Sequence, residues 1–332
     1  MTGSGRGNDA GRPDGAGPAP DMRLVFSGTA GELFPIVLIN ALLTLVTLGF
    51  YRFWARTRVR RYLWAHLRFL DDPFEYTGEG RELFLGFVVI FFLILVPLAG
   101  ASWGVFWLGS EGRGGDADTL STILTVVYVF LFGVAVYRAR RYRLSRTRWR
   151  GIRFGQGGSS LMYGLFYLVL SGLNLVTLGW TVPLAQTELW TREIDNSWLG
   201  NARFRFDGGS GAIYGRFALV WFTLLPSLGL SYAWYVSARL RHFARATALG
   251  EFQFSFDVTG GEVLRFWLAN ALLLLLTLGL ATPFVQLRKV RFLARHLIVA
   301  GAPENLDDIL QSRAQAPRIG EGLADAFDIG AI

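Results

Sequence analysis

Long uncharged stretches alternate with short basic clusters along the chain. The uncharged runs cover residues 33–51, 83–110, 119–137, 154–187, 217–238 and 266–287. The shortest of these runs has 19 residues, and a helix needs about 20 apolar residues to cross a hydrocarbon core ~30 Å thick. A core helix of a soluble protein is usually shorter and keeps a polar face. The pattern therefore predicts an all-α polytopic membrane protein with about six transmembrane helices.

The runs belong to an internal repeat. Residues 26–67 align without gaps on residues 256–297, with 18 of 42 positions identical. Leucine-rich composition alone could not place Glu, Asn, Gly and His in register, and weaker copies recur about every 50 residues. We expect a disordered polar tail, a repeat-built transmembrane domain at 23–300 and a polar C-terminal tail. The boundaries are 1–22 for the first tail, 23–73, 74–153, 154–203, 204–253 and 254–300 for the units, and 301–332 for the second tail.

Each unit opens with aromatic residues two positions apart, followed by glycine. Phe74, Tyr76 and Gly78 illustrate the pattern. This spacing places both rings on one face of a short strand, and the glycine allows a sharp turn into the next helix. Most units then leave the hydrophobic span through an arginine-rich, aromatic helix such as 52–64. Short interfacial β-strands and basic amphipathic helices are therefore expected beside the spans.

These residues carry a resemblance to a known family. The first unit contains Gly31-Glu32-Leu33, Asn40 and Thr47-Leu48-Gly49, and its basic helix contains Trp54-Ala-Arg56-Thr-Arg58 and Arg60-Arg61-Tyr62. In these motifs the chain resembles the YjgN-like family of uncharacterised bacterial inner-membrane proteins (domain of unknown function 898). The resemblance covers roughly residues 24–300. It implies a multi-pass protein of the inner (cytoplasmic) membrane and supplies no activity, substrate or catalytic residue.

Charge and composition limit the other function classes. The formal net charge is +8 and there is no cysteine, so disulfides and thiolate metal sites are excluded. Membrane topology accounts for the basic clusters, since arginine near span ends marks the cytoplasmic side, and no nucleic-acid partner is expected. His66, His242 and His296 lie on basic helices, where arginines repel cations, so we expect no metal or cofactor. No catalytic motif is present, and the chain is not expected to be an enzyme.

The arginine-rich helices are the first candidate site. Guanidinium groups bind phosphate bidentately, and basic clusters beside spans attract anionic lipid by about 1 kcal/mol per charge. Ordinary positive-inside signals are the alternative explanation. The residues proposed to bind lipid headgroups are Arg56, Arg58, Arg60, Arg61, Arg141 and Arg143.

Polar residues at matched repeat positions are the second candidate site. Glu32 and Glu262 open spans, where a carboxylate also favours a helix N-terminus. Asn40 and Asn270 follow eight residues later, about 12 Å deeper by helical rise. A buried amide usually bonds a neighbouring helix and less often lines a solute path. These four residues form the candidate intramembrane polar path.

Two topologies and two functions follow. With simple alternation of six helices, which we expect, the acidic loop at 111–118 faces outside. The alternative makes the first and last units re-entrant at their Thr-Leu-Gly turns, with both termini cytoplasmic. The first functional hypothesis is a transporter or channel for a small solute. The second is a non-catalytic membrane protein that binds anionic lipid or organises partners through its basic helices. The solute, the coupling ion and the oligomeric state stay open.

Overall fold

A closed ring of short strands forms the base of the molecule. The computed structural model describes residues 21–301, so the expected tails lie outside the described residues apart from Asp21, Met22 and Gly301. Within this range ten antiparallel strands close into a barrel in chain order, and β1 (Asp21–Phe26) pairs with β10 (Leu297–Ala300). The other strands are β2 (Leu67–Phe69), β3 (Asp72–Tyr76), β4 (Thr147–Trp149), β5 (Ile152–Gln156), β6 (Ser197–Leu199), β7 (Ala202–Phe206), β8 (Thr247–Leu249) and β9 (Phe252–Phe256).

Antiparallel pairing separates the two rims of the ring. Each odd-numbered strand runs into a helix, and each even-numbered strand from β2 to β8 runs into a tight turn. All helical connections therefore leave from one rim, and the turns lie at the other. The turn at Leu70 and Asp71 and the turn at Arg150 and Gly151 have positive φ at both residues, as in the two-residue hairpins that match strand twist. Asp21 pairs with Ala300 at the turn rim, so both ends of the described chain leave there.

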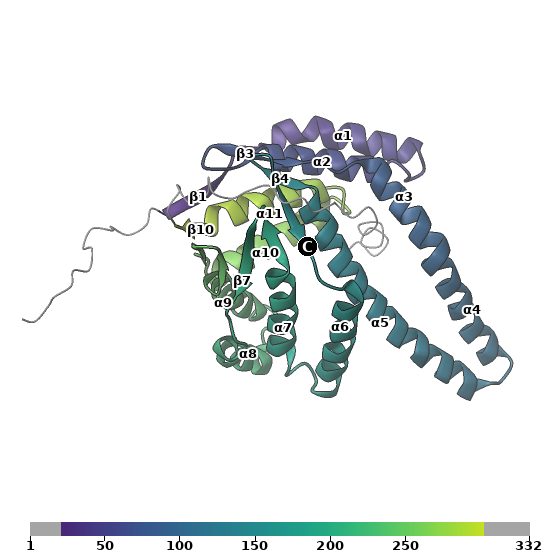
Figure 1. Cartoon of the computed structure of the whole chain (residues 1–332). Helices are drawn as coiled ribbons and strands as arrows, with labels where there is room; N and C mark the ends of the chain where they lie inside the picture. Colours follow the sequence, from purple (N-terminus) through teal and green to yellow (C-terminus); the bar gives the residue numbers. More distant parts are fainter. Residues whose placement is uncertain (1–20, 302–332) are drawn as a thin grey trace, which may run out of the picture.

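Helical hairpins rise from the other rim (Figure 1). The short hairpins are α1 (Ala30–Val46) with α2 (Arg52–Ala65), α6 (Ser160–Val176) with α7 (Val182–Asp195), α8 (Gly211–Thr223) with α9 (Tyr232–Arg245), and α10 (Gly260–Leu276) with α11 (Thr282–His296). The long arm consists of α3 (Gly80–Ile90), the π-helical turn η1 (Phe91–Leu95), α4 (Val96–Ser110) and the returning α5 (Gly114–Ser145). In Figure 1 the long arm projects beyond the short hairpins.

A left-handed leucine followed by glycine turns each short hairpin. Leu48 has φ 51° and Gly49 has φ 93°, and the Gly49 N–H donates to the Thr44 carbonyl at 2.7 Å. This six-to-one hydrogen bond ends a helix in a left-handed turn. The same backbone conformation recurs at Leu178-Gly179, Leu228-Gly229 and Leu278-Gly279.

The prediction of an all-α bundle with six transmembrane helices is wrong. The runs at 33–51, 154–187, 217–238 and 266–287 each contain a Leu-Gly turn and fold back on themselves, so the helices do not simply alternate across a membrane. In the part of the chain that the structure describes, only Gly80–Ser110 and Gly114–Ser145 are long and apolar enough to span a bilayer. Counting uncharged residues measured apolar length but could not detect a left-handed turn inside it.

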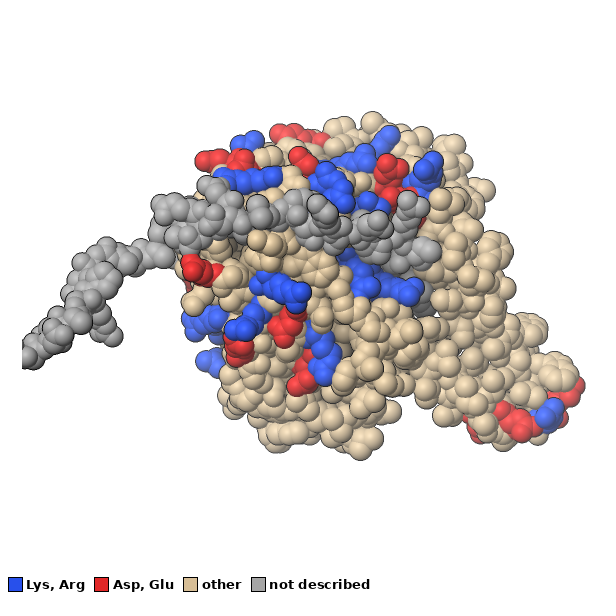
Figure 2. Space-filling view, in the orientation of Figure 1, with Lys and Arg blue, Asp and Glu red and all other residues tan. Residues whose placement is uncertain are grey.

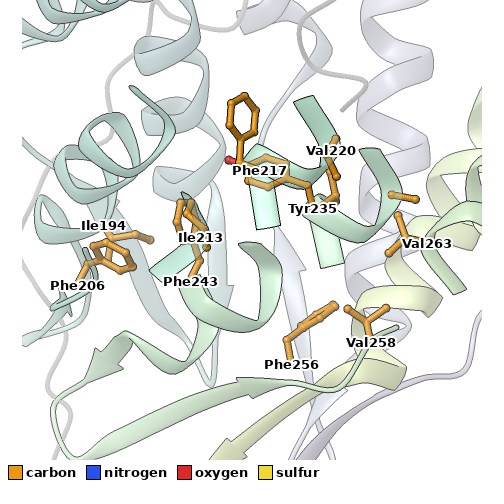
Figure 3. Packing of buried hydrophobic residues seen from close by; sticks show 12 residues of the cluster. Ile194, Phe206, Ile213, Phe217, Val220, Tyr235, Phe243, Phe256, Val258 and Val263 are labelled. Carbon is orange, nitrogen blue, oxygen red and sulfur yellow. The ribbon is translucent and has the colours of Figure 1, made fainter. Parts of the chain in front are cut away.

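Apolar packing joins neighbouring hairpins. One cluster brings together Phe217 and Val220 from α8, Tyr235 from α9 and Val263 from α10 (Figure 3). Between α5 and α6, a Cβ added to Gly133 would lie 2.6 Å from Cβ of Tyr167. The two helices approach closely because no side chain separates them there, as is common where helices pack in membranes.

The outer surface of the hairpins is apolar and exposed. Charged residues gather around the ring and the bases of the hairpins, whereas the long arm is uncharged along its length and charged again at its far end (Figure 2). At that end Arg113 and Asp116 form an ion pair at 2.7 Å. The turn leucines of the short hairpins are almost fully exposed: Leu48 89%, Leu178 79%, Leu228 91% and Leu278 91%. A monomer rarely exposes so large an apolar patch to water.

Candidate functional site

The basic helices form the layer that contacts the ring. The second helix of each hairpin packs against the strand that opens the next unit, as α2 does on β3 and α5 does on β5. The last contact, α11 on β1, closes the circle. The arginines of these helices therefore lie between repeat units.

A repeated arginine joins one unit to the next at four of the five junctions in the described chain; unit 154–203 has Thr191 at the equivalent position. The Arg61 guanidinium donates to the Gly78 carbonyl at 2.9 Å, and Arg291 donates to the Gly28 carbonyl at 2.7 Å. Arg141 donates to the Gly157 and Gly158 carbonyls, and Arg241 donates to the Val258 carbonyl. Arg61 and Arg141, two of the residues proposed to bind lipid, thus hold the strand-to-helix turn of the following unit. Arg241 and Arg291 align with Arg61 in the repeat, but they were not predicted as site residues from the sequence.

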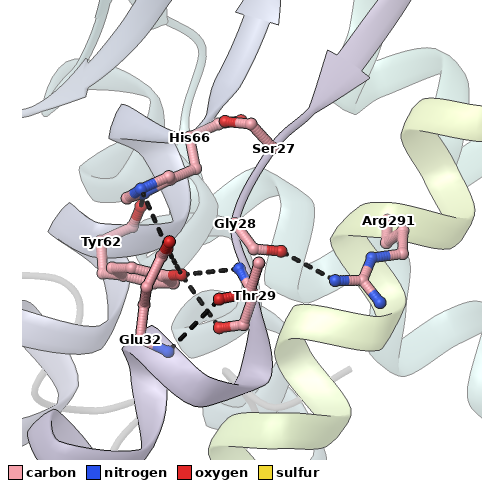
Figure 4. Close-up of polar contacts among 7 residues, drawn as sticks. All are labelled: Ser27, Gly28, Thr29, Glu32, Tyr62, His66 and Arg291. Atoms are coloured by element: carbon pink, nitrogen blue, oxygen red, sulfur yellow. Dashed lines mark hydrogen bonds and ion pairs between the residues drawn. The ribbon is translucent and has the colours of Figure 1, made fainter.

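Glu32 belongs to a polar cluster at the base of the first hairpin (Figure 4). The Tyr62 hydroxyl donates to Glu32 Oε2 at 2.8 Å and accepts the Thr29 N–H at 2.8 Å. His66 Nε2 lies 3.6 Å from the same carboxylate oxygen. The hydrogen bond from Tyr62, followed by the contacts with Thr29 and His66, holds the pKa of Glu32 below its usual range despite partial desolvation.

Glu262 caps its own helix. Its side chain accepts the Thr259 N–H at 2.8 Å, and the Thr259 hydroxyl accepts the Glu262 N–H at 3.3 Å. This reciprocal pair is a capping box. The Thr259 backbone bond is the main reason that the pKa of Glu262 is also lowered.

The paired asparagines are buried inside their hairpins. Asn40 Nδ2 donates to the Ala55 carbonyl across the α1–α2 hairpin at 3.4 Å. The side-chain oxygens of Asn40 and Asn270 are buried without a hydrogen-bond partner among residues 21–301. Asn40 therefore bonds a neighbouring helix and keeps one unused acceptor.

A groove opens between the first and last hairpins. It has a volume of about 820 Å³ and is walled by α1, α2 and the start of α11. Leu38, Leu42, Leu45 and Leu48 form its apolar wall, and its polar lining consists of Asn40, Thr44, Arg52, Arg56, Arg60, Thr282 and Gln286. The groove thus unites Asn40 with Arg56 and Arg60, which the sequence assigned to two separate sites. It excludes the other predicted residues: Glu32, Glu262, Asn270, Arg58, Arg61, Arg141 and Arg143.

A second group of charged residues, here called the basic cluster, comes from four helices. It consists of Arg60, Arg140, Arg143, Glu193 and Lys289, which come from α2, α5, α7 and α11. Arg140 lies 3.5 Å from Glu193, and the Tyr163 hydroxyl donates to Glu193 at 2.6 Å. Arg60 donates to the Tyr76 hydroxyl at 3.3 Å. Of this cluster, the sequence pointed to Arg60 and Arg143 alone.

Comparisons with known proteins give a family and relatives. The model of a family described as a bacterial protein of unknown function, DUF898, matches residues 21–231 and 222–326. Inner membrane protein YjgN of Salmonella typhimurium is 30% identical over 167 residues, which cover 47% of this chain and 39% of that protein. Inner membrane protein YjgN of Escherichia coli O157:H7 is 30% identical over 163 residues, covering 48% and 37%. The match thus spans less than half the length of these curated relatives. No solved structure matches the chain.

Proposed function

The chain belongs to the DUF898 family, as its resemblance to YjgN-like proteins predicted, and on this premise we propose that it binds anionic phospholipid in the groove of α1, α2 and α11. The relatives named inner membrane proteins support an inner-membrane location. The observation that carries the proposal is the pairing, in one groove, of a leucine wall with three arginines.

The proposed topology uses the two kinds of hairpin differently. The 31 and 32 residues of the spans in the long arm give about 47 Å of helix each, more than the ~30 Å hydrocarbon core, and the charged end of the arm emerges on the far side. The 17 residues of α1 reach about 25 Å. The turn after α1 exposes a leucine, whereas the end of the long arm carries charged residues. The short hairpins therefore enter the bilayer and return, with the ring and both described ends on the cytoplasmic side. This orientation agrees with the arginines near the ring, because arginine and lysine are enriched on the cytoplasmic side of membrane proteins.

Groove geometry matches the two ends of a phospholipid. Leu38, Leu42 and Leu45 lie at helical spacing on the exposed face of α1, which suits an acyl chain. Arg52, Arg56 and Arg60 lie at intervals of four residues on α2, so their guanidinium groups follow one side of that helix. Guanidinium groups take phosphate through paired hydrogen bonds. A phospholipid with its anionic headgroup beside α2 and its acyl chains along α1 therefore contacts both walls of the groove.

The transporter hypothesis stays a prediction. The ring does not provide a polar path for a solute. The cavity inside it is about 210 Å³ and is lined by apolar side chains such as Phe69, Trp149 and Leu199. Uptake of solute into proteoliposomes would favour transport over lipid binding.

Lipid retention tests the proposal. We expect the wild-type protein, purified in neutral detergent, to retain phosphatidylglycerol over phosphatidylcholine by native mass spectrometry. The double variant Arg52→Gln/Arg56→Gln should lose this preference by roughly fivefold per charge, since each arginine contributes about 1 kcal/mol at an anionic surface. Arg203→Gln is the matched control, because Arg203 is exposed on β7 outside the groove. An equal loss in the control variant, or no preference in the wild type, would contradict the proposal.

A further inference from the structure

A second cavity, here called the inner pocket, is walled by α7, α9 and strands of the ring. Its volume of about 460 Å³ falls within the usual range of small-molecule sites, about 300–1,000 Å³. It shares no lining residue with the groove of α1, α2 and α11. Most of its lining is apolar and includes Leu189, Ile194, Phe204, Leu240, Phe243 and Phe254.

Two hydrogen-bond donors belong to residues that line the inner pocket and have no partner. Trp190 Nε1 is buried and donates to no atom of residues 21–301. The Trp190 ring stacks on Phe243 at 5.4 Å between centroids, and the Arg140 guanidinium lies 5.5 Å from its centroid. Arg239 is partly buried and forms no hydrogen bond or ion pair within residues 21–301. A buried donor without an acceptor is unfavourable, so both groups favour a ligand that supplies oxygen.

The charge left over in the inner pocket is positive. Among the described residues, Glu193 and Arg239 are the charged groups in its lining. Glu193 is already balanced, because one carboxylate oxygen accepts the Tyr163 hydroxyl at 2.6 Å and the other lies 3.5 Å from Arg140. Arg239 therefore retains one positive charge, which favours a ligand with a single negative charge.

The ring cavity extends the inner pocket. Phe204, Phe254 and Leu297 line both cavities, so the two adjoin. The ring cavity adds about 210 Å³ with an apolar lining. A ligand whose charged end lies at Arg239 therefore has room for a hydrocarbon chain in the ring.

We propose that the inner pocket binds an amphipathic monocarboxylate of the fatty-acid class. Its carboxylate accepts hydrogen bonds from Arg239 and from Trp190 Nε1, which are donors only. Its chain extends along the aromatic lining toward the ring cavity, where burial of apolar surface favours binding. This site does not depend on lipid binding in the groove of α1, α2 and α11.

Quenching of tryptophan fluorescence by ω-bromododecanoate tests the site. The full chain is placed in phosphatidylcholine nanodiscs at alkaline pH, where the acid is ionised. Trp190 lines the inner pocket and Trp149 lines the ring cavity, so a brominated chain in either cavity quenches fluorescence. Quenching should saturate in the wild type. Arg239→Gln should weaken binding roughly tenfold or more at an unchanged melting temperature. Arg245→Gln is the matched control, because Arg245 is exposed on α9 outside the inner pocket, and it should bind as the wild type does.

The carboxylate and the chain are tested separately. Uncharged ω-bromododecanol should bind the wild type roughly tenfold more weakly than the acid does, and Arg239→Gln should bind the two equally. As competitors, octanoate, dodecanoate and hexadecanoate should gain affinity with length only until both cavities are filled. Arg52→Gln/Arg56→Gln should bind the acid as the wild type does, which separates this site from the groove.

Four results would overturn the inference. They are quenching that does not saturate in the wild type, equal wild-type affinity for acid and alcohol, unchanged affinity in Arg239→Gln, and affinity that rises with chain length in parallel with partition into the bilayer. A loss of acid binding in Arg52→Gln/Arg56→Gln would place the acid in the groove and would also overturn it.

Discussion

At the scale of single residues, the Tyr62 hydroxyl joins the beginning and the end of the first hairpin. It holds the Glu32 carboxylate, and this hydrogen bond is the main cause of the lowered pKa of Glu32. A carboxyl group whose pKa is lower in the folded state stabilises that state above its ordinary pKa of about 4.3. The stabilisation disappears as the pH falls through the lower, folded value.

This linkage gives a pH-dependent prediction. Glu32→Gln should melt at a lower temperature than the wild type at pH 7, and the difference should shrink as the pH falls from the ordinary pKa of about 4.3 through the lower pKa of the folded state. Melting curves in detergent between pH 3 and pH 7 measure it. Tyr62→Phe should reproduce part of the loss at pH 7. A constant gap between wild type and Glu32→Gln over the whole range would show that charge on Glu32 is irrelevant.

Asn40 gives a second prediction at this scale. Because its amide spans the hairpin to the Ala55 carbonyl, Asn40→Leu should destabilise the protein by on the order of 0.6 kcal/mol, the average for such bonds between membrane helices. Asn40→Gln should retain part of the stability. If Asn40 and Asn270 line a solute path instead, the leucine variants will melt normally and reduce flux in proteoliposomes.

At the scale of elements, the Leu-Gly turn separates what the sequence could predict from what it could not. The Thr-Leu-Gly triplets were visible as repeated residues, and the paired aromatics marked strands such as β3. A leucine in the left-handed region costs roughly 1–2 kcal/mol, so the backbone preference of leucine does not predict a left-handed turn. Strands β2, β4, β6 and β8 have three residues each, too few for an alternating pattern.

The same limit applies to the candidate site. Spacing along α2 could identify Arg56 and Arg60 as neighbours on one helix. It could not show that Asn40 shares their groove, because that contact depends on the hairpin turning at Leu48. Nor could it bring Lys289 to Arg143, which requires the ring to place the last hairpin beside the earlier ones.

Depth in the bilayer tests the short hairpins. The chain has no cysteine, so Leu278→Cys and Gly114→Cys each accept one spin label. In reconstituted vesicles, the label at position 278 should be accessible to oxygen and shielded from a water-soluble nickel reagent, because the proposed topology puts the Leu-Gly turn in hydrocarbon. The label at position 114, at the charged end of the long arm, should be accessible to the nickel reagent. Equal nickel accessibility at both positions would contradict insertion of the short hairpins.

At the scale of the whole molecule, the ring depends on contact between the two ends of the described chain. Arg23 and Ile298 are cross-strand partners in β1 and β10. Their neighbours Met22 and Val299 are buried, so Arg23 and Ile298 point outward on the other face of the pair. Cross-strand Cα atoms about 4.5–5.5 Å apart lie within the range that a disulfide can bridge.

We expect Arg23→Cys/Ile298→Cys to form an intramolecular disulfide and to raise the melting temperature. Closing so long a loop stabilises by about 5.6 kcal/mol in the chain-entropy account. Non-reducing electrophoresis and melting with and without reductant measure both effects. The pair Arg203→Cys/Ile298→Cys is the control, because β7 and β10 are not neighbours. Cross-linking in the control alone would exclude the closed ring.

Closure of the ring between its first and last strands also constrains biosynthesis. A ribosome delivers β1 at the start and β10 only after every hairpin has been made, so a nascent or truncated chain presents two open strand edges. Such edges pair readily with other chains. In the proposed topology, hairpins that enter the membrane during synthesis do so while the ring is still incomplete. On that topology, premature termination before Leu297 leaves a membrane-inserted product that associates with other chains through its unpaired strands.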